Sequence, residues 1–263
     1  MQGVPVYWFS ELGCCGRNRM RSERSEAGGD LVRNIVVTSI IDAVVEDLKA
    51  QVLARELKPG QALTEAEVAA RYDIARATAK AAIERLVGEK VLVRKNHKTA
   101  RVVKLGPADV RDIYRTRAYL ESEVLRRLAD RREVPLEARL ANAEIEALWH
   151  QGSFDIVEPD MRFHTSLIDS LGSARTSNIY GSLAFEVKLC MAQLQGSQRL
   201  SPEVIVAEHA RILEQIEVGD ADAAAALLDE HLSRARELLA AQLGGEPGPE
   251  AFRPSSALPQ AIS

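Results

Sequence analysis

The second half of the chain has a single kind of pattern. Apolar residues recur at helical spacing from Ala108 to Leu243, and no stretch there shows the strict alternation of a strand. Glycine and proline, which end helices, interrupt the pattern five times. The segments between these breaks predict six amphipathic helices, over residues 108–131, 135–150, 154–171, 175–196, 202–218 and 221–243. Short connections between such helices favour an antiparallel bundle.

The pattern before this region is different. Apolar spacing over residues 38–57 predicts a helix that ends at Pro59-Gly60. A second, short helix should begin at Thr64, because Thr64 and Glu67 have the spacing of a capping box. The third runs from about Arg76 to Val87, and two segments rich in β-branched residues follow it, 91–94 and 100–104. Three helices and a hairpin predict a winged helix-turn-helix.

We therefore expect a mainly α protein with two folded domains. The boundary falls at Gly106-Pro107, between a winged helix-turn-helix domain at 31–105 and a helical domain at 106–243. Residues 1–30 lack periodicity, and residues 244–263 are rich in Pro, Gly and Ser. Both terminal segments are predicted to be disordered.

The charge is divided unevenly along the chain. The net charge is −4, which by itself argues against nucleic acid as a partner. However, residues 31–105 contain 14 basic and 9 acidic residues, whereas residues 106–243 contain 15 and 23. Residues 71–104 are the most basic, with 10 basic and 3 acidic residues. This density is typical of a phosphate-binding face, although a solvated basic surface is the simpler interpretation of charge alone.

Cysteine usage and hydropathy indicate where the protein acts. Cys14, Cys15 and Cys190 provide neither a disulfide framework nor a CxxC metal motif. The longest apolar runs are shorter than the roughly 18–20 residues that span a membrane. The N-terminus also lacks the order of regions found in a signal peptide. We expect a cytoplasmic protein with no membrane partner.

The third helix of a helix-turn-helix enters the major groove with its N-terminal half, where Arg and Lys reach guanine edges. That half contains Arg76, Thr78 and Lys80. Basic residues before the turn and on the wing can neutralise phosphates, and they are Arg71, Arg94, Lys95, Lys98 and Arg101. One helix reads only a few base pairs, so we expect a homodimer that binds a pseudo-palindromic operator.

Three histidines and an aspartate have the spacing of a metal site. Asp160 and His164 are four positions apart, so both leave one helix face. His209 precedes Gly219 by 10 residues and His231 follows it by 12. In a hairpin about that glycine, both imidazoles would stand about 15–18 Å from the turn. Such a set suits Zn, Ni, Mn or Co and leaves positions open. From spacing alone, capping or surface histidines remain an alternative.

The DNA-binding segment resembles the GntR family of bacterial regulators. The similarity covers the whole domain and lies in Leu57-Lys58-Pro59-Gly60-x-x-Leu63-Thr64-Glu65-x-Glu67-Val68-Ala69 and in the segment from Ile74 to Leu86. The family usually has Ser before the recognition Arg and a Pro-Val-Arg run shortly after it. This chain has Ala75 and Thr78-Ala79-Lys80 at those positions. Because Lys lacks the bidentate geometry of Arg, the usual operator should not be assumed.

The helical domain resembles the FCD domain of the FadR-type branch of that family. The similarity lies in four stretches: Asp160-x-x-Phe163-His164, Glu208-His209-x-x-Ile212-Leu213, Gly219-Asp220-x-x-Ala223 and His231-Leu232. The resemblance implies that Asp160, His164, His209 and His231 bind a divalent ion. It also suggests a small organic acid or fatty-acyl effector, and a repressor. The opening helix matches too, at Tyr114-x-x-Arg117-x-x-Leu120-Glu121, which suggests Arg117 as an effector contact, with a surface ion pair as the alternative.

The sequence therefore predicts an effector-responsive transcriptional regulator and not an enzyme. The main alternative is a metal-dependent hydrolase or oxygenase-like enzyme with an accessory DNA-binding domain, because one Asp and three His with open positions can also catalyse. No Glu is placed as a general base in the manner of His-Glu-x-x-His, and the basic domain would then lack a purpose. A non-specific nucleoid-like DNA binder is a third possibility, and it would show no effector and little sequence selectivity.

Overall fold

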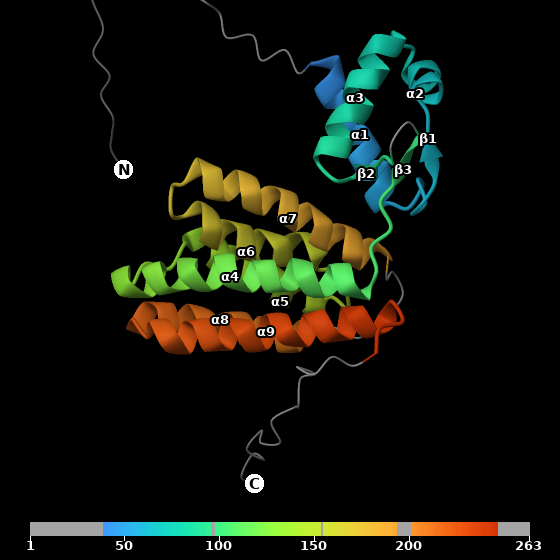
Figure 1. The fold of residues 1–263 in the computed structure, drawn as a ribbon. Coiled ribbons are helices and arrows are strands. Elements are labelled where there is room, and N and C mark those ends of the chain that lie inside the picture. The colour runs from blue at the N-terminus through green and yellow to red at the C-terminus, as the bar shows by residue number, and fades with distance from the viewer. Residues whose placement is uncertain (1–38, 96–97, 154, 194–200, 247–263) are drawn as a thin grey trace, which may run out of the picture. The chain divides into compact units, whose positions relative to one another are not determined.

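The structure is a computed structural model that describes residues 39–95, 98–153, 155–193 and 201–246. The predicted extension at 1–30, the start of the predicted DNA-binding domain at 31–38, and residues 96 and 97 of the wing turn lie outside these residues. Most of the predicted tail, from residue 247 onward, does so as well. The two described parts are a winged domain, up to Leu105, and a helical bundle that begins at Pro107 (Figure 1).

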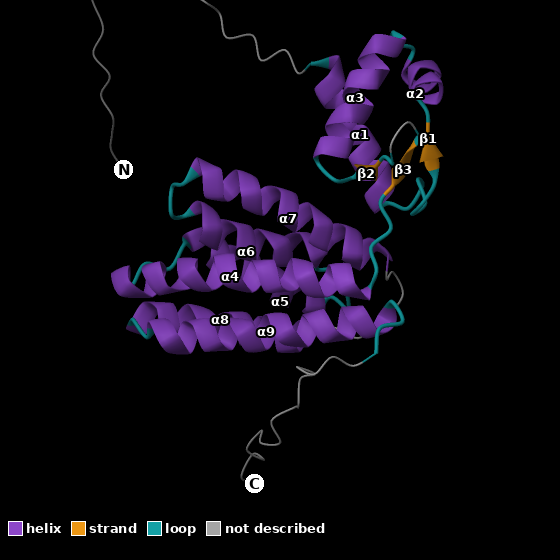
Figure 2. Ribbon diagram, in the orientation of Figure 1, coloured by secondary structure: helices purple, strands orange, loops and turns teal. Residues whose placement is uncertain are grey.

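The winged domain consists of three helices and a small sheet. Its elements are α1 (Ile40–Leu53), β1 (Ala62–Leu63), α2 (Glu65–Tyr72), α3 (Arg76–Gly88), β2 (Leu92–Val93) and β3 (Ala100–Val102). The strands form an antiparallel sheet in the order β1-β3-β2 (Figure 2). The predicted winged helix-turn-helix is confirmed. Strand β1 was not predicted, because its two residues are too few to show alternation.

Side-chain caps fix the starts of the first two helices. Thr64 Oγ1 accepts a hydrogen bond from the Glu67 amide at 3.2 Å, and Glu67 Oε2 accepts from the Thr64 amide at 2.8 Å, as the capping-box spacing predicted. Ser39 and Asp42 form a second such box at α1. The other end of α1 differs from the prediction. The helix stops at Leu53, before Pro59-Gly60, and Arg55 takes a left-handed φ of 61°.

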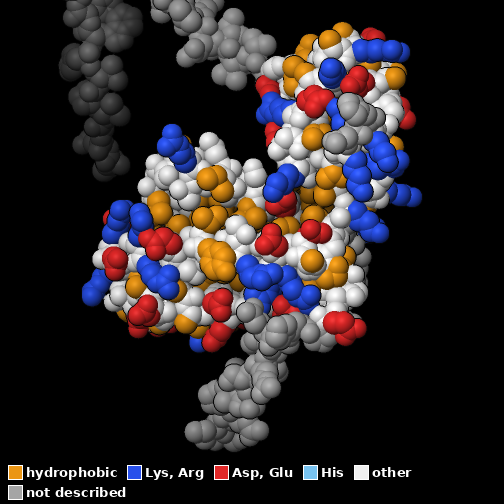
Figure 3. All heavy atoms as spheres, viewed as in Figure 1, with side chains coloured by type: hydrophobic (Ala, Val, Ile, Leu, Met, Phe, Trp, Pro, Cys, Tyr) orange, Lys and Arg blue, Asp and Glu red, His pale blue; other side chains and the backbone are white. Residues whose placement is uncertain are grey.

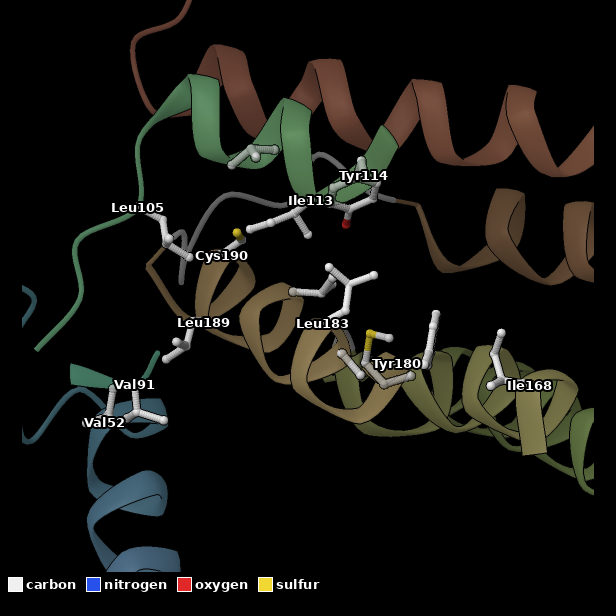
Figure 4. Close-up of a cluster of buried hydrophobic side chains, with 14 of the residues drawn as sticks. Val52, Val91, Leu105, Ile113, Tyr114, Ile168, Tyr180, Leu183, Leu189 and Cys190 are labelled. Atoms are coloured by element: carbon white, nitrogen blue, oxygen red, sulfur yellow. The ribbon is translucent and has the colours of Figure 1, made fainter. Parts of the chain in front are cut away.

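The rest of the described chain forms the predicted six-helix bundle. Its helices are α4 (Pro107–Arg131), α5 (Leu136–His150), α6 (Val157–Asp169), α7 (Ala174–Gln193), α8 (Pro202–Val218) and α9 (Ala221–Gln242). The long helix α4 contacts α6, α7, α8 and α9, and Figure 1 shows it running along the length of the bundle. In Figure 4, Ile113 and Tyr114 of α4 face Leu183 and Tyr180 of α7. Because α4 borders most of the other helices, polar groups on its buried face can meet residues from several of them.

A tight turn at Gly219 makes α8 and α9 antiparallel neighbours. Gly219 has a φ of 86°, a conformation that residues with a Cβ rarely adopt. A Cβ at this position would also lie 2.9 Å from Arg132 Nε. The turn matters for the site, because it places residues at similar distances on either side of Gly219 level with each other. Among the described residues, no helix is both long enough and apolar enough to cross a membrane.

Candidate functional site

Four potential metal ligands meet inside the helical bundle. Asp160 and His164 lie on α6, His209 on α8 and His231 on α9, and one ligand atom from each lies within 4.8 Å of the others. The rings of His209 and His231 have centroids 4.9 Å apart, as the spacing about Gly219 predicted. His164 and His209 are completely buried, so the alternative of surface or capping histidines is wrong.

Several buried nitrogen atoms in this cluster have no hydrogen-bond partner among the residues that the structure describes. They are Nε2 of His164 and both ring nitrogens of His209. An unpaired buried polar atom is costly, because it has lost its water without gaining a protein partner. The closest acidic atom to His209 is Oδ1 of Asp160, 3.6 Å from Nε2, which is beyond a normal hydrogen bond. Three imidazoles and a carboxylate with free lone pairs are the donor set of a borderline divalent ion, so the residues fit such an ion.

A carboxylate outside the predicted ligand set contacts the first of these histidines. Glu121 of α4 lies with Oε2 2.7 Å from Nδ1 of His164. Its other oxygen, Oε1, accepts hydrogen bonds from Arg117 Nε at 2.8 Å and from the Tyr180 hydroxyl at 2.7 Å. All four side chains are buried. Glu121 thus connects α4, α6 and α7 in one polar network.

A second carboxylate has the same relation to another histidine of the cluster. Glu208 of α8 lies with Oε2 2.7 Å from Nδ1 of His231 on α9. Its Oε1 also accepts a hydrogen bond from Arg234 Nε at 2.9 Å. The Glu208 side chain is 21% exposed, whereas that of Glu121 is 1% exposed. Two of the three histidines are therefore held at Nδ1 by a carboxylate.

The environment keeps the carboxylates ionised and the two innermost histidines neutral. Burial would raise the pKa of Glu121, but the adjacent Arg117 and His164 outweigh it and hold the pKa well below its usual range. Burial likewise opposes ionisation of Glu208, yet hydrogen bonds from His231 and Arg234 lower its pKa. Burial lowers the pKa of His164, and it lowers the pKa of His209 much further, with His231 and His164 adding to the effect. Neutral imidazole is the form that binds metal.

The predicted effector contact, Arg117, lies in this network and not on the surface. Its side chain is 1% exposed, so the alternative of a surface ion pair is wrong. Nε is paired with Glu121, but Nη2 is buried and has no hydrogen-bond partner in the described part of the chain. The nearby hydroxyl of Tyr114 also lacks one, and the Arg117 guanidinium lies 4.9 Å from the centre of the Tyr114 ring. Both groups can donate a hydrogen bond to an anionic ligand.

The sequence analysis missed the residues that support the cluster. Glu208 directly precedes His209, and Arg234 follows His231 by three positions, but these spacings do not show that Glu208 turns toward α9. Glu121 was noted only as part of a resemblance, and Tyr180 gave no signal. Such contacts join residues on different helices, and only packing brings them together.

The predicted DNA-contacting residues of the third helix lie on the winged domain with free polar groups. Arg76 and Lys80 of α3 are exposed, one turn apart, and neither has a protein partner among the described residues. Thr78 is half-buried between them. Ala75, at the N-cap of α3, supplies no side-chain cap, so the first amides of the helix remain available. Figure 3 shows Lys and Arg side chains close together on this domain.

The other predicted contacts differ in how strongly the protein itself holds them. Lys95 and Lys98, on either side of the undescribed turn residues, are exposed and unpaired among the described residues. Arg71 Nη1 donates to Gln51 Oε1 at 2.6 Å, and Arg101 Nη1 donates to the Gly60 carbonyl at 3.0 Å. Arg94 forms an ion pair with Glu84, which partly neutralises it. The two lysines are therefore the wing residues with the most freely available charge.

Fold and site together define a class of protein. A winged helix-turn-helix with exposed basic residues is a DNA-binding domain, and the bundle after it contains a buried cluster suited to ligand binding. A single chain that joins a DNA-binding domain to a sensory domain is a one-component transcriptional regulator.

Comparison with known proteins identifies the family within this class. The family described as "Bacterial regulatory proteins, gntR family" matches residues 40–102, and the FCD domain family matches residues 112–234. The HTH-type transcriptional regulator YdhC of Bacillus subtilis (strain 168) is 27% identical over 67% of this chain and 80% of its own length. BphR of Paraburkholderia xenovorans (strain LB400), also named an HTH-type transcriptional regulator, is 25% identical over 64% of this chain and 73% of its own length.

Solved structures agree on the fold. A GntR regulator from Rhodococcus sp. RHA1 aligns with a TM-score of 0.66 at 18% identity and covers 76% of this chain and 96% of its own. McbR/YncC of E. coli aligns with a TM-score of 0.62, also at 18% identity, and covers 78% of this chain and 98% of its own. The protein belongs to the GntR family of bacterial regulators, in the branch with an FCD effector-binding domain.

Proposed function

We propose that the protein is a homodimeric repressor in which the FCD domain binds one divalent ion and a small carboxylate or acyl effector. Asp160, His164, His209 and His231 would hold the ion. The observation that supports this is the convergence of four buried ligand groups within 4.8 Å, with unpaired nitrogens on two of the histidines. A bound ion would supply open coordination positions that a carboxylate oxygen can occupy.

Two further donors near the cluster suit an anionic effector. Arg117 Nη2 and the Tyr114 hydroxyl are both buried, and no group among the described residues accepts a hydrogen bond from either, so a ligand carboxylate could accept one from each. Arg117 is the effector contact in this proposal, and Tyr114 extends it. The effector in this proposal is a small anion in which one oxygen binds the metal ion and another accepts a hydrogen bond from Arg117.

The DNA-binding role is assigned to eight residues. Arg76, Thr78 and Lys80 of α3 would read base edges, while Arg71, Arg94, Lys95, Lys98 and Arg101 would contact phosphates. The effector site lies in a separate domain, reached through Gly106-Pro107 and α4. The effector would therefore act by changing the relative placement of the two winged domains of a dimer, and not by covering the DNA-binding face. A protein in this role acts in the cytoplasm.

A single series of measurements tests the proposal. DNA fragments retained by the protein from sheared bacterial DNA are sequenced to find the operator, and its affinity is then measured with chelator-treated and Zn²⁺-loaded protein. The measurement is repeated for both forms of the protein with each member of a panel of mono-, di- and tricarboxylates and acyl-CoA thioesters. We expect at least one compound to weaken operator binding by the loaded protein only. Operator binding that no compound changes in either form would contradict effector sensing.

The same samples address the enzymatic alternative. Membership in a regulator family favours a binding role for the cluster, so we propose that it does not catalyse. Compounds that weaken operator binding should be recovered unchanged after incubation with the Zn²⁺-loaded protein. Suppose instead that the wild type converts at least one equivalent of such a compound and that a His209→Ala variant converts none. This result would support the hypothesis of a hydrolase or oxygenase-like enzyme.

A further inference from the structure

We propose that Glu121 and Glu208 are positioning residues that fix the ring tautomer of two proposed metal ligands, so that His164 and His231 both present Nε2 to the ion. The inference rests on the proposed metal site. It goes beyond that site by assigning a role to two carboxylates that are not ligands. It also predicts that the third histidine, His209, is held in a different way.

The contact between Glu121 and His164 settles which nitrogen bears the proton. The Glu121 carboxylate accepts hydrogen bonds from Arg117 Nε and from the Tyr180 hydroxyl, so it is the acceptor in its contact with His164 as well. The Nδ1 of His164, 2.7 Å from Glu121 Oε2, must therefore carry the hydrogen. In a neutral imidazole that bears its hydrogen on Nδ1, Nε2 has the free lone pair. That Nε2 is the atom left buried without a partner.

Glu208 makes the same contact with His231 from another pair of helices. Its Oε2 lies 2.7 Å from Nδ1 of His231, and Arg234 holds the same carboxylate from the other side. Because Glu208 accepts a hydrogen bond from Arg234 Nε, the carboxylate is the acceptor here too, and the hydrogen belongs on Nδ1 of His231. Each carboxylate lies on a different helix from its histidine, with α4 supporting α6 and α8 supporting α9. The orientation of each ring thus depends on the packing of a helix pair.

His209 has no such support among the described residues. Both of its ring nitrogens lack a partner, and its ring lies against the phenyl ring of Phe163. Stacking fixes the plane of the imidazole but does not distinguish its two tautomers. The cluster therefore contains two histidines locked by carboxylates and one held only by its ring face.

The effect of a positioning residue on metal affinity can be measured. Carboxylates that accept the second N–H of a metal-bound histidine set its orientation and raise its basicity, and their loss typically weakens metal binding about 10–100-fold. Glu208 is the better test position of the two. It is partly exposed, whereas removing Glu121 would leave the Arg117 guanidinium buried without its counter-ion.

The experiment compares three substitutions in the full chain with the wild type. Glu208→Ala removes the contact to His231. Arg234→Ala removes the other partner of Glu208 but leaves the His231 contact in place, and Glu214→Ala removes an exposed carboxylate on the same helix. The tautomers are determined in metal-free, ¹⁵N-labelled protein at pH 8 by two-bond ¹H–¹⁵N correlation. Zn²⁺ affinity is measured by competition with a chelating dye, and helicity by circular dichroism.

We expect His231 to be protonated at Nδ1 in the wild type and in the Arg234 and Glu214 variants. Glu208→Ala should lose that tautomer and bind Zn²⁺ about 10–100-fold more weakly, with unchanged helicity. An unchanged tautomer, or a Zn²⁺ affinity within twofold of the wild type, would overturn the positioning role. Failure of the wild type itself to bind Zn²⁺ is a distinct result, and it would overturn the metal site on which the role depends.

Discussion

The imidazole of His209 lies parallel to the phenyl ring of Phe163, with ring centroids 3.6 Å apart and an angle of 2° between the planes. This stack joins α8 to α6 at the centre of the proposed metal site. It provides apolar contact to a histidine whose two nitrogens have no hydrogen-bond partner. The proposed site is therefore well packed around polar atoms that have no partner among the described residues, and ligand binding should relieve that cost.

Replacing His209 by Ala should remove the response to metal and leave the bundle folded. A ligand that binds only the native state stabilises it by about 2.7 kcal/mol at 100 times its Kd. We expect Zn²⁺ to raise the thermal unfolding temperature of the wild type by several degrees and to leave that of His209→Ala unchanged. Loss of an unpaired buried polar group should partly offset the cavity that the substitution creates.

Two further measurements complete this test. His150→Ala, on the exposed end of α5, is the matched control and should respond to Zn²⁺ as the wild type does. The double variant His209→Ala, His231→Ala should contain no metal after gel filtration, as measured by mass spectrometry. One equivalent of retained metal in that variant would contradict the assignment of the ligands.

Sequence-specific DNA binding should depend on α3. The double substitution Arg76→Ala, Lys80→Ala removes two exposed side chains that have no partner among the described residues, so the fold should be unaffected. Contacts of this kind contribute about 1–3 kcal/mol each to discrimination between bases. We expect the double variant to bind operator and random DNA with similar affinity in fluorescence-anisotropy titrations at one salt concentration. The control, Arg175→Ala with Arg211→Ala on the helical bundle, should retain that preference.

The protein should bind its operator as a two-fold symmetric dimer. One recognition helix reads only a few base pairs, and symmetry doubles the contacts. Sedimentation velocity should therefore give about twice the chain mass of 28.9 kDa for the free protein, and the retained DNA should contain half-sites about one helical turn apart. A monomer both alone and on operator DNA would be incompatible with this arrangement.

Effector and operator should influence each other to the same extent. Because the two sites lie in separate domains of one chain, their coupling is a linkage, which is reciprocal and typically about 5–150-fold. An effector found in the screen above should bind the operator-bound protein more weakly than the free protein, by the same factor by which it weakens DNA binding. Calorimetric titrations with and without operator measure both factors. Equal effector affinity in the two titrations would rule out the proposed coupling.

The capping box of α2 should contribute stability that depends on pH. Thr64→Ala should destabilise the protein by about 1 kcal/mol at pH 7, since it removes an N-cap. The hydrogen bond from the Thr64 backbone amide is the main reason why the pKa of Glu67 is lowered. A lowered carboxyl pKa means stabilisation that is complete above the ordinary value of 4.5 and is lost as the pH falls through the lowered value.

Urea unfolding of wild type and Thr64→Ala, followed by circular dichroism, checks this expectation. Thr64→Ala keeps the backbone amide but removes the hydrogen bond that the Thr64 hydroxyl donates to Glu67 Oε2 at 2.8 Å, which also lowers the pKa of Glu67. The difference between the two midpoints should therefore be larger at pH 7 than at pH 3. Glu65→Gln changes a residue in the same turn but outside the capping box. Its urea midpoint should differ little from that of the wild type, and this difference should be the same at pH 7 and at pH 3. A midpoint difference between wild type and Thr64→Ala that is constant across this range would contradict the role given to Glu67.

The sequence by itself determined the features that depend on local spacing. Helical periodicity and its interruptions gave the six helices of the bundle, and the Thr64-Glu67 spacing gave the start of α2. Even the approach of His209 to His231 followed from counting residues on either side of Gly219, because a helix has a fixed rise per residue. The four-residue spacing of Asp160 and His164 predicted a second pair on one helix face, and the family resemblance indicated that both pairs bind one ion.

Only the tertiary structure decided which groups surround these residues. The sequence does not show that Glu121 and Glu208 reach across to His164 and His231, that Arg117 is buried, or that Phe163 stacks on His209. The short strand β1 was missed for the same reason, since it exists only through its pairing with β3. Periodicity states which face of a helix is buried, but not which residue of another helix meets it. That depends on how the helices pack, and packing joins residues far apart in the chain.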